Sequence, residues 1–153
     1  MKALVHTKPF KLEFKNYDEP KCNNNDILIK IAAVGICGSD VHGFSGSTGR
    51  RIPPLIMGHE AAGEIIEVPD NSKFKIGDKV TFDSTIYCGE CNYCVKKQIN
   101  LCSNRKVLGV SCNEYKQNGA MAEYISIPER IVYKINENID FNDAALIEPA
   151  SVA

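Results

Sequence analysis

The chain has 153 residues, of which 44% are hydrophobic and 24% charged, and its formal net charge at pH 7 is −1. This size allows one ordinary hydrophobic core, and the near-zero charge gives no broad attraction for nucleic acid or anionic lipid. No apolar stretch approaches the ~20 residues that span a bilayer, and the N-terminus lacks the hydrophobic region of a signal peptide. We therefore expect a cytoplasmic protein without a nucleic-acid or membrane partner.

Short β-forming runs dominate the chain. The run 26–36 is the clearest, because isoleucines at alternate positions give way to a wholly apolar stretch, as in a strand that becomes buried. Other runs lie at hairpin spacing between breakers such as Lys8-Pro9 and Gly77-Asp78. The predicted strands are 3–6, 12–14, 26–36, 65–68, 80–82, 121–127 and 131–135. They predict a mostly antiparallel, barrel-like β domain.

Two other segments have different patterns. Residues 43–54 show neither the helical nor the strand period of apolar residues, and they are rich in turn formers, so we expect a loop there. Near the C-terminus, Asp140 can cap a helix that contains the apolar residues 144–147. Glu148 precedes a proline, which disfavours helical backbone, so we expect a break that turns its carboxylate into a cavity.

Cys37 and His59 could share a catalytic metal ion. Zinc accepts thiolate, imidazole and carboxylate ligands, and a catalytic zinc uses three of them and leaves one position open. Their separation is too long for a zinc-finger knuckle, so a folded sheet must bring them together. Glu60 and Glu148 each offer a carboxylate. Taken alone, a single cysteine and a single histidine are more often packing residues than ligands.

Three polar residues follow Cys37 closely. Asp40 could hold the second ring nitrogen of His59 as an outer partner. Ser39 and His42 are spaced to pass a proton outward from the site, although an exposed serine and histidine on a turn is the simpler interpretation.

The most specific motif is the run Cys88-x2-Cys91-x2-Cys94-x7-Cys102. Four thiolates in so short a segment can close a tetrahedral site, which is how a structural zinc is held. A disulfide pair or an iron–sulfur cluster is the alternative, but the ferredoxin spacing is absent and the total of seven cysteines is odd. Cys22 and Cys112 have no partner motif and are expected to be free thiols.

These motifs together resemble the N-terminal catalytic domain of the zinc-dependent medium-chain alcohol and polyol dehydrogenases, which has a GroES-like fold. The resemblance covers essentially residues 1–153. Its motifs are Gly35-Ile36-Cys37-Gly38-Ser39-Asp40-Val41-His42, Gly58-His59-Glu60-Ala61-Ala62-Gly63, the four cysteines, Gly119-Ala120-Met121-Ala122-Glu123-Tyr124 and Glu148-Pro149.

The resemblance implies two zinc ions per chain. Cys37, His59 and either Glu60 or Glu148 would hold the catalytic zinc, with the other carboxylate exchanging or holding water. Cys88, Cys91, Cys94 and Cys102 would hold the structural zinc in a lobe at about 86–105. Ser39 and His42 would relay the proton next to the cofactor.

The resemblance also implies a partner domain and a substrate. No G-x-G-x-x-G motif is present, so NAD or NADP would need a Rossmann domain outside these residues, and the whole enzyme would be a homodimer or homotetramer. Gly38 and Glu148 resemble the sugar-alcohol branch, whereas Pro69 departs from a usual glycine and affects only a turn. We therefore expect oxidation of a polyol or polyol phosphate, with L-threonine or a simple secondary alcohol as alternatives.

Arg50 and Arg51 lie in the predicted loop between the two metal ligands. A guanidinium pair there would suit a phosphate or carboxylate on the substrate, although two solvated arginines are the simpler interpretation.

The competing function is a zinc-stabilised binding module in which both metals serve only folding. Redox sensing through the cysteines is a third idea.

Overall fold

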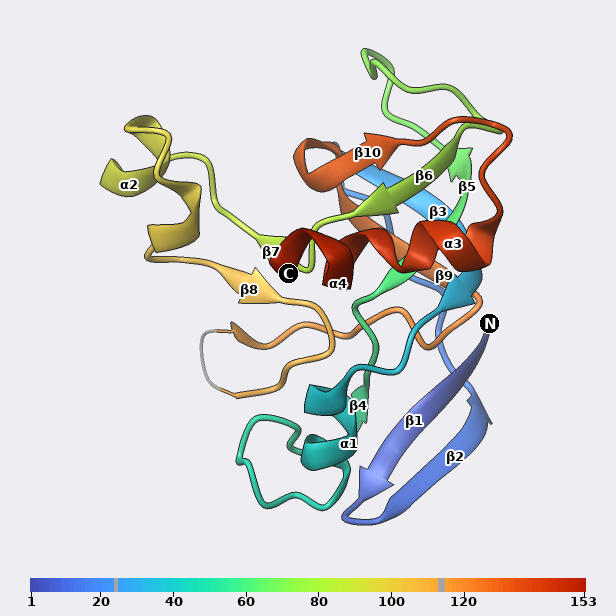
Figure 1. The fold of residues 1–153 in the computed structure, drawn as a ribbon, viewed down its shortest axis with the longest axis vertical. Helices are drawn as coiled ribbons and strands as arrows, with labels where there is room; N and C mark the ends of the chain where they lie inside the picture. The colour runs from blue at the N-terminus through green and yellow to red at the C-terminus, as the bar shows by residue number, and fades with distance from the viewer. Residues whose placement is uncertain (24, 113–114) are drawn as a thin grey trace.

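The computed structural model describes residues 1–23, 25–112 and 115–153, and it is built mainly of β-strands (Figure 1). The strands form a five-stranded sheet, a three-stranded sheet and a two-stranded sheet. All paired strands in these sheets run antiparallel. The expected antiparallel, partly open barrel-like architecture is therefore confirmed.

The five-stranded sheet contains the main hydrophobic core. In sheet order, its strands are β10 (Val132–Lys134), β6 (Lys79–Phe82), β5 (Ala61–Glu67), β3 (Asp26–Val34) and β9 (Tyr124–Pro128). In β3, Ile27 and Ile29 are fully buried while Lys30 is exposed, as the alternation in the sequence predicts. The predicted strand 121–127 instead begins at Tyr124, because the residues before it cross over to the other sheet, where Ala122 bridges Ala3.

The three-stranded sheet forms a second, smaller core at the other end of the molecule. In sheet order, it consists of β2 (Lys11–Asn16), β1 (Lys2–Lys8) and β4 (Leu55–Ile56). Val5 and Ile56 pair directly and are both buried. Strand β4 therefore holds the start of the segment that leads to His59.

A short helix that the sequence pattern did not reveal follows β3. Strand β3 ends at Val34, two residues earlier than expected, and α1 (Gly38–Phe44) begins directly after Cys37. The predicted loop therefore starts after Phe44 rather than at Gly43. The sequence pattern did not indicate this helix because glycine, serine and aspartate are weak helix formers. The Cys37 sulfur caps the helix by accepting a hydrogen bond from the Ser39 amide.

Two helices cross the five-stranded sheet near the C-terminus. The expected cap is present: the Asp140 side chain accepts from the Asn142 amide at the start of α3 (Phe141–Ala145). The expected break at Glu148 is wrong, because the break falls at Leu146 and α4 (Ile147–Val152) already includes Glu148. Pro149 lies in the first turn of α4, where no intrahelical N–H is needed.

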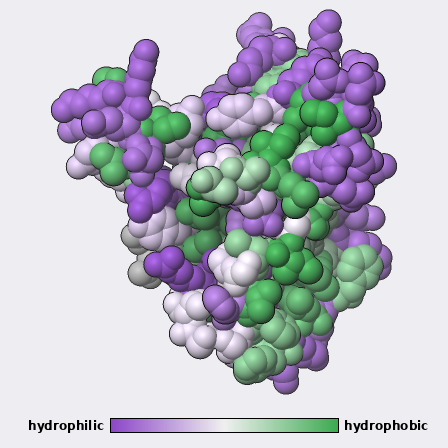
Figure 2. Space-filling model, viewed as in Figure 1, coloured by the Kyte–Doolittle hydropathy of each residue, from purple (hydrophilic) through white to green (hydrophobic). Residues whose placement is uncertain are grey.

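The four-cysteine lobe projects from the body of the molecule (Figure 1). Strands β7 (Thr85–Ile86) and β8 (Lys106–Val107) lead into and out of it, and it contains α2 (Asn92–Val95) and a 3-10 turn at Ile99–Leu101. Figure 2 shows the projection as mostly hydrophilic. In the part of the chain that the structure describes, no helix is long and apolar enough to cross a membrane.

Candidate metal centres and substrate cleft

The structure brings Cys37, His59 and Glu60 together. Each offers one donor atom, and these atoms lie within 4.8 Å of one another. Cys37 is held by the start of α1, whereas His59 and Glu60 directly precede β5 and are buried. Glu148 is not part of this group of donors.

Two close backbone approaches fix Glu60 and His59. The Gly35 amide donates to the Glu60 carbonyl at 2.6 Å, and a Cβ at Gly35 would lie 2.6 Å from Glu60 Oε2. Behind His59, Gly58 has φ +90°, and a Cβ at Gly119 would lie 2.1 Å from the Gly58 oxygen. Main-chain packing that only glycine permits therefore positions both side chains.

Asp40 lies behind His59 and is itself anchored by Arg51. Asp40 Oδ2 is 3.6 Å from His59 Nδ1, and Asp40 Oδ1 accepts from Arg51 Nε at 3.3 Å and Nη2 at 3.2 Å. Arg51 Nη2 also donates to the Ser39 hydroxyl at 3.0 Å. Asp40 and Arg51 are 1% and 5% exposed, so the ion pair is shielded from water.

The donor set fits a zinc ion. Thiolate, imidazole and carboxylate are the ligand types that zinc accepts. Among the described residues, Asp40 Oδ2 and His59 Nδ1 are buried with no hydrogen-bond partner. A hydrogen on Nδ1 that points to Asp40 would leave Nε2 of His59 to bind a metal, which is the usual arrangement of a histidine ligand and its carboxylate partner.

The four cysteines of the lobe also come together. Cys88, Cys91, Cys94 and Cys102 present sulfur atoms within 4.8 Å of one another, and none forms a disulfide. The backbone amides of Cys94 and Ser103 lower the pKa of Cys91 to about 6.

Two other thiols of the lobe, those of Cys88 and Cys94, also favour a cation at its centre. Hydrogen bonds from the amides of Glu90 and Cys91 lower the pKa of Cys88. Burial raises the pKa of Cys94 to about 12, so its thiolate needs a cation nearby. Four sulfur donors arranged in this way fit a closed, structural zinc site.

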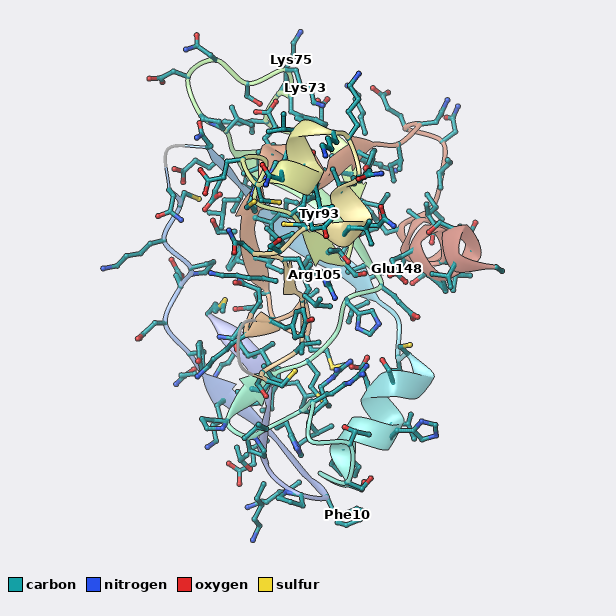
Figure 3. The ribbon with its side chains drawn as sticks, turned by 90° about the vertical axis from the view of Figure 1, so that its left-hand side faces the viewer. Phe10, Lys73, Lys75, Tyr93, Arg105 and Glu148 are labelled. Atoms are coloured by element: carbon teal, nitrogen blue, oxygen red, sulfur yellow. The ribbon has the colours of Figure 1, made fainter. Side chains whose placement is uncertain are left out.

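A cleft of about 690 Å³ lies beside His59. Its lining includes the remaining candidate catalytic and substrate residues, Ser39, His42, Arg50, Arg51 and Glu148, together with Arg105 and Tyr115. Figure 3 shows Arg105 and Glu148 at a similar height below Tyr93 of the lobe. Sequence patterns could not single out Arg105 or Tyr115, because neither belongs to a motif.

The two arginines singled out in the sequence have different environments. Arg50 is exposed, whereas Arg51 is buried and its charge is paired with Asp40. They do not form the expected guanidinium pair for a substrate anion. Because Asp40 neutralises the charge of Arg51, this arginine is not free to bind a substrate anion. The adjacency of Arg50 and Arg51 in the sequence could not reveal this difference.

Comparison with known proteins defines the family. Residues 23–137 match the model of the alcohol dehydrogenase GroES-like domain, and the chain belongs to this family. It is 40% identical to D-arabitol-phosphate dehydrogenase of Enterococcus avium, over 90% of this chain and 38% of that protein. It is 38% identical to L-threonine 3-dehydrogenase of Pyrococcus furiosus, over 97% of this chain and 43% of that protein.

A solved structure agrees with the fold. Galactitol-1-phosphate dehydrogenase of Escherichia coli superposes with a TM-score of 0.89 and 27% identity, covering 99% of this chain and 43% of that one. The chain thus spans less than half the length of these relatives.

Proposed function

We propose that these residues form the catalytic domain of a zinc-dependent dehydrogenase that oxidises a secondary alcohol of a polyol or polyol phosphate to a ketone. The observation that carries the proposal is the donor group Cys37, His59 and Glu60 at the edge of a cleft. A Rossmann domain outside these residues would supply NAD or NADP, and the whole enzyme would be a cytoplasmic homodimer or homotetramer.

Cys37, His59 and Glu60 would hold the zinc, and Glu148, which lines the same cleft, would exchange with Glu60 or hold water. When bound, zinc supplies Lewis acidity towards the alcohol oxygen. A nicotinamide cofactor would accept the hydride from the substrate carbon, and the hydroxyl proton would leave separately.

Ser39 and His42 would carry that proton to solvent. They lie three residues apart on α1, a spacing that places side chains on the same helix face, and both line the cleft. The Ser39 oxygen accepts a hydrogen bond from Arg51. One lone pair remains to accept the substrate proton, while the Ser39 hydrogen can pass to His42.

Replacing Cys37 by serine tests the catalytic assignment. We expect the full-length Cys37→Ser enzyme to bind one zinc per chain instead of two and to lose NAD reduction. Metal analysis and turnover measure the two effects, and a circular dichroism spectrum like that of the wild type shows that the fold remains. Retained turnover would contradict the assignment.

A zinc-stabilised binding module is the competing function. It would hold one tight zinc at the four cysteines, whereas the enzyme needs a second zinc that chelators remove first. L-threonine is the alternative substrate, and the similarity to L-threonine 3-dehydrogenase supports testing it alongside the polyols.

A further inference from the structure

Three arginines line the cleft, and they differ in how far their donors are already used. Arg51 is 5% exposed, and its Nε and Nη2 donate to Asp40 and Ser39. Its charge is therefore committed within the protein. A ligand in the cleft would have to break a buried ion pair to engage it.

Arg105 is held in place but keeps donors to spare. Its Nη1 donates to the Cys102 carbonyl at 3.3 Å and its Nη2 to the Tyr115 hydroxyl at 3.0 Å, and its Cζ lies 5.0 Å from the centre of the Tyr115 ring. A guanidinium has five N–H donors, so about three remain for a ligand. No carboxylate pairs with Arg105 among the described residues. It is a fixed cation facing a cleft.

Arg50 supplies a second charge, on an exposed side chain. This side chain forms no ion pair within the described residues. Its backbone is anchored, because its amide donates to Thr48 Oγ1 at 3.3 Å and its carbonyl accepts from the Ser111 amide at 3.1 Å. The long side chain can therefore move over the cleft from a fixed base.

We propose that Arg105, assisted by Arg50, binds an anionic end group of the alcohol substrate, and that this group is a phosphate. The proposal rests on the proposed function and refines its substrate class. A phosphate monoester carries about −1.5 to −2 charge at neutral pH and three acceptor oxygens, which match a planar guanidinium with free donors and a second cation. The carboxylate of L-threonine also accepts hydrogen bonds from a guanidinium, but it carries less charge than a phosphate.

The lobe determines where Arg105 lies. The Cys102 carbonyl that accepts from Arg105 belongs to one of the four clustered cysteines. The structural metal centre and the selection of substrate are thus linked through one hydrogen bond.

The test compares D-arabitol, D-arabitol phosphate and L-threonine as substrates of the full-length enzyme. For the wild type, we expect D-arabitol phosphate to have the highest kcat/KM. We expect Arg105→Met to lower that value about 10- to 100-fold, mainly through KM, since a hydrogen bond to a charged group contributes about 1.5–3 kcal/mol. Turnover of D-arabitol should change less than about threefold, and Arg105→Lys should restore part of the phosphate preference.

Arg130→Met is the matched control. Arg130 also stacks on a tyrosine, Tyr87, and donates to its carbonyl at 2.8 Å, but it does not line the cleft. We expect no change in any of the three reactions. Zinc analysis of each variant shows whether the lobe is intact.

Several outcomes would overturn the proposal. Equal kcat/KM for D-arabitol and its phosphate, a phosphate preference that survives in Arg105→Met, or a preference for L-threonine would each do so. Calorimetric binding of D-arabitol phosphate separates the hypothesis of an anion site at Arg105 from the proposed dehydrogenase function. Binding that depends on Arg105 in an enzyme that oxidises none of the three alcohols would leave the anion site standing and reject the proposed function.

Discussion

Arg50 and Arg51 are neighbours in sequence, yet the fold gives them opposite environments. Arg51 is buried beside Asp40, and Arg50 faces solvent. A Cβ at Gly43 would lie 2.1 Å from Arg51 Cγ, so the last turn of α1 leaves space for this arginine through a glycine. Arg51 therefore acts as a positioning residue that connects Asp40, and through it His59, to the loop before β4.

Replacing Arg51 by methionine should damage both stability and metal binding. The Asp40 carboxylate would remain buried without a partner, and loss of one member of a buried pair costs about 3–5 kcal/mol. Urea unfolding measures this loss. We also expect zinc affinity at the Cys37, His59 and Glu60 site to fall about 10- to 100-fold in a chelator competition, because the support of His59 is disturbed.

Two further variants make this test specific. Arg50→Met should change stability by less than about 0.5 kcal/mol, as for an ordinary surface position. The double variant Asp40→Asn, Arg51→Met should be more stable than the sum of the single changes implies, since it leaves no unpaired charge. Strict additivity would contradict the role of the pair.

At the scale of elements, we expect the lobe to depend on a metal ion bound by its four cysteines. It protrudes from the body, and its helices contain only one buried residue, Cys94. With so little apolar burial, we expect its order to come mainly from a cation bound by the four sulfurs.

Cys94→Ala should therefore loosen the lobe selectively. We expect faster amide hydrogen exchange in residues 87–105, a lower Tm and the loss of one zinc per chain, while exchange in β3 and β5 stays unchanged. Cys22→Ala is the control, because Cys22 lies outside the cluster and, among the described residues, accepts a single long hydrogen bond, from Ser126. Unchanged exchange in the lobe of Cys94→Ala would disprove a structural zinc.

An exposed ion pair joins the turn before β6 to the end of β10. Lys134 donates to Asp78, and this contact, followed by the Lys75 amide, lowers the pKa of Asp78 below its usual value of 3.8. A carboxylate whose pKa is lowered by folding adds stability above its unfolded pKa, and this contribution is lost as the pH falls through the lowered value.

Lys134→Met should consequently have a pH-dependent effect. At neutral pH we expect a loss of about 0.2–1 kcal/mol, because the lysine is largely exposed to solvent. The difference from the wild type in urea unfolding should close as the pH is lowered below 3.8. Lys75→Met keeps the amide hydrogen bond and should show a smaller effect, and a Lys134→Met deficit independent of pH would reject this explanation.

At the scale of the molecule, local patterns predicted the strands and the metal donors better than the connections between them. The alternation at Ile27 and Ile29 identified β3, because burial of one sheet face imposes a period of two. Likewise, the cysteine spacing predicted the cluster that the structure brings together. Both signals lie within short segments.

Features that depend on contacts distant in sequence could not be predicted. Arg105 reaches the cleft only because β8 returns from the lobe beside β7. Helix α1 was missed for a different, local reason, because it consists largely of weak helix formers. The burial of Arg51 depends on Asp40, eleven positions earlier. Periodicity and spacing contain no information about such pairings.

The glycine contacts behind His59 separate two kinds of mutational freedom. Gly58 and Gly119 meet through main-chain atoms, so this support of His59 does not depend on which side chains line the cleft. Positions such as Arg50 and Arg105 can therefore vary without disturbing it. In the proposed enzyme, a few replacements along the cleft could therefore change the preferred alcohol while the proposed metal site is preserved, which would be a structural basis for the evolvability of substrate choice.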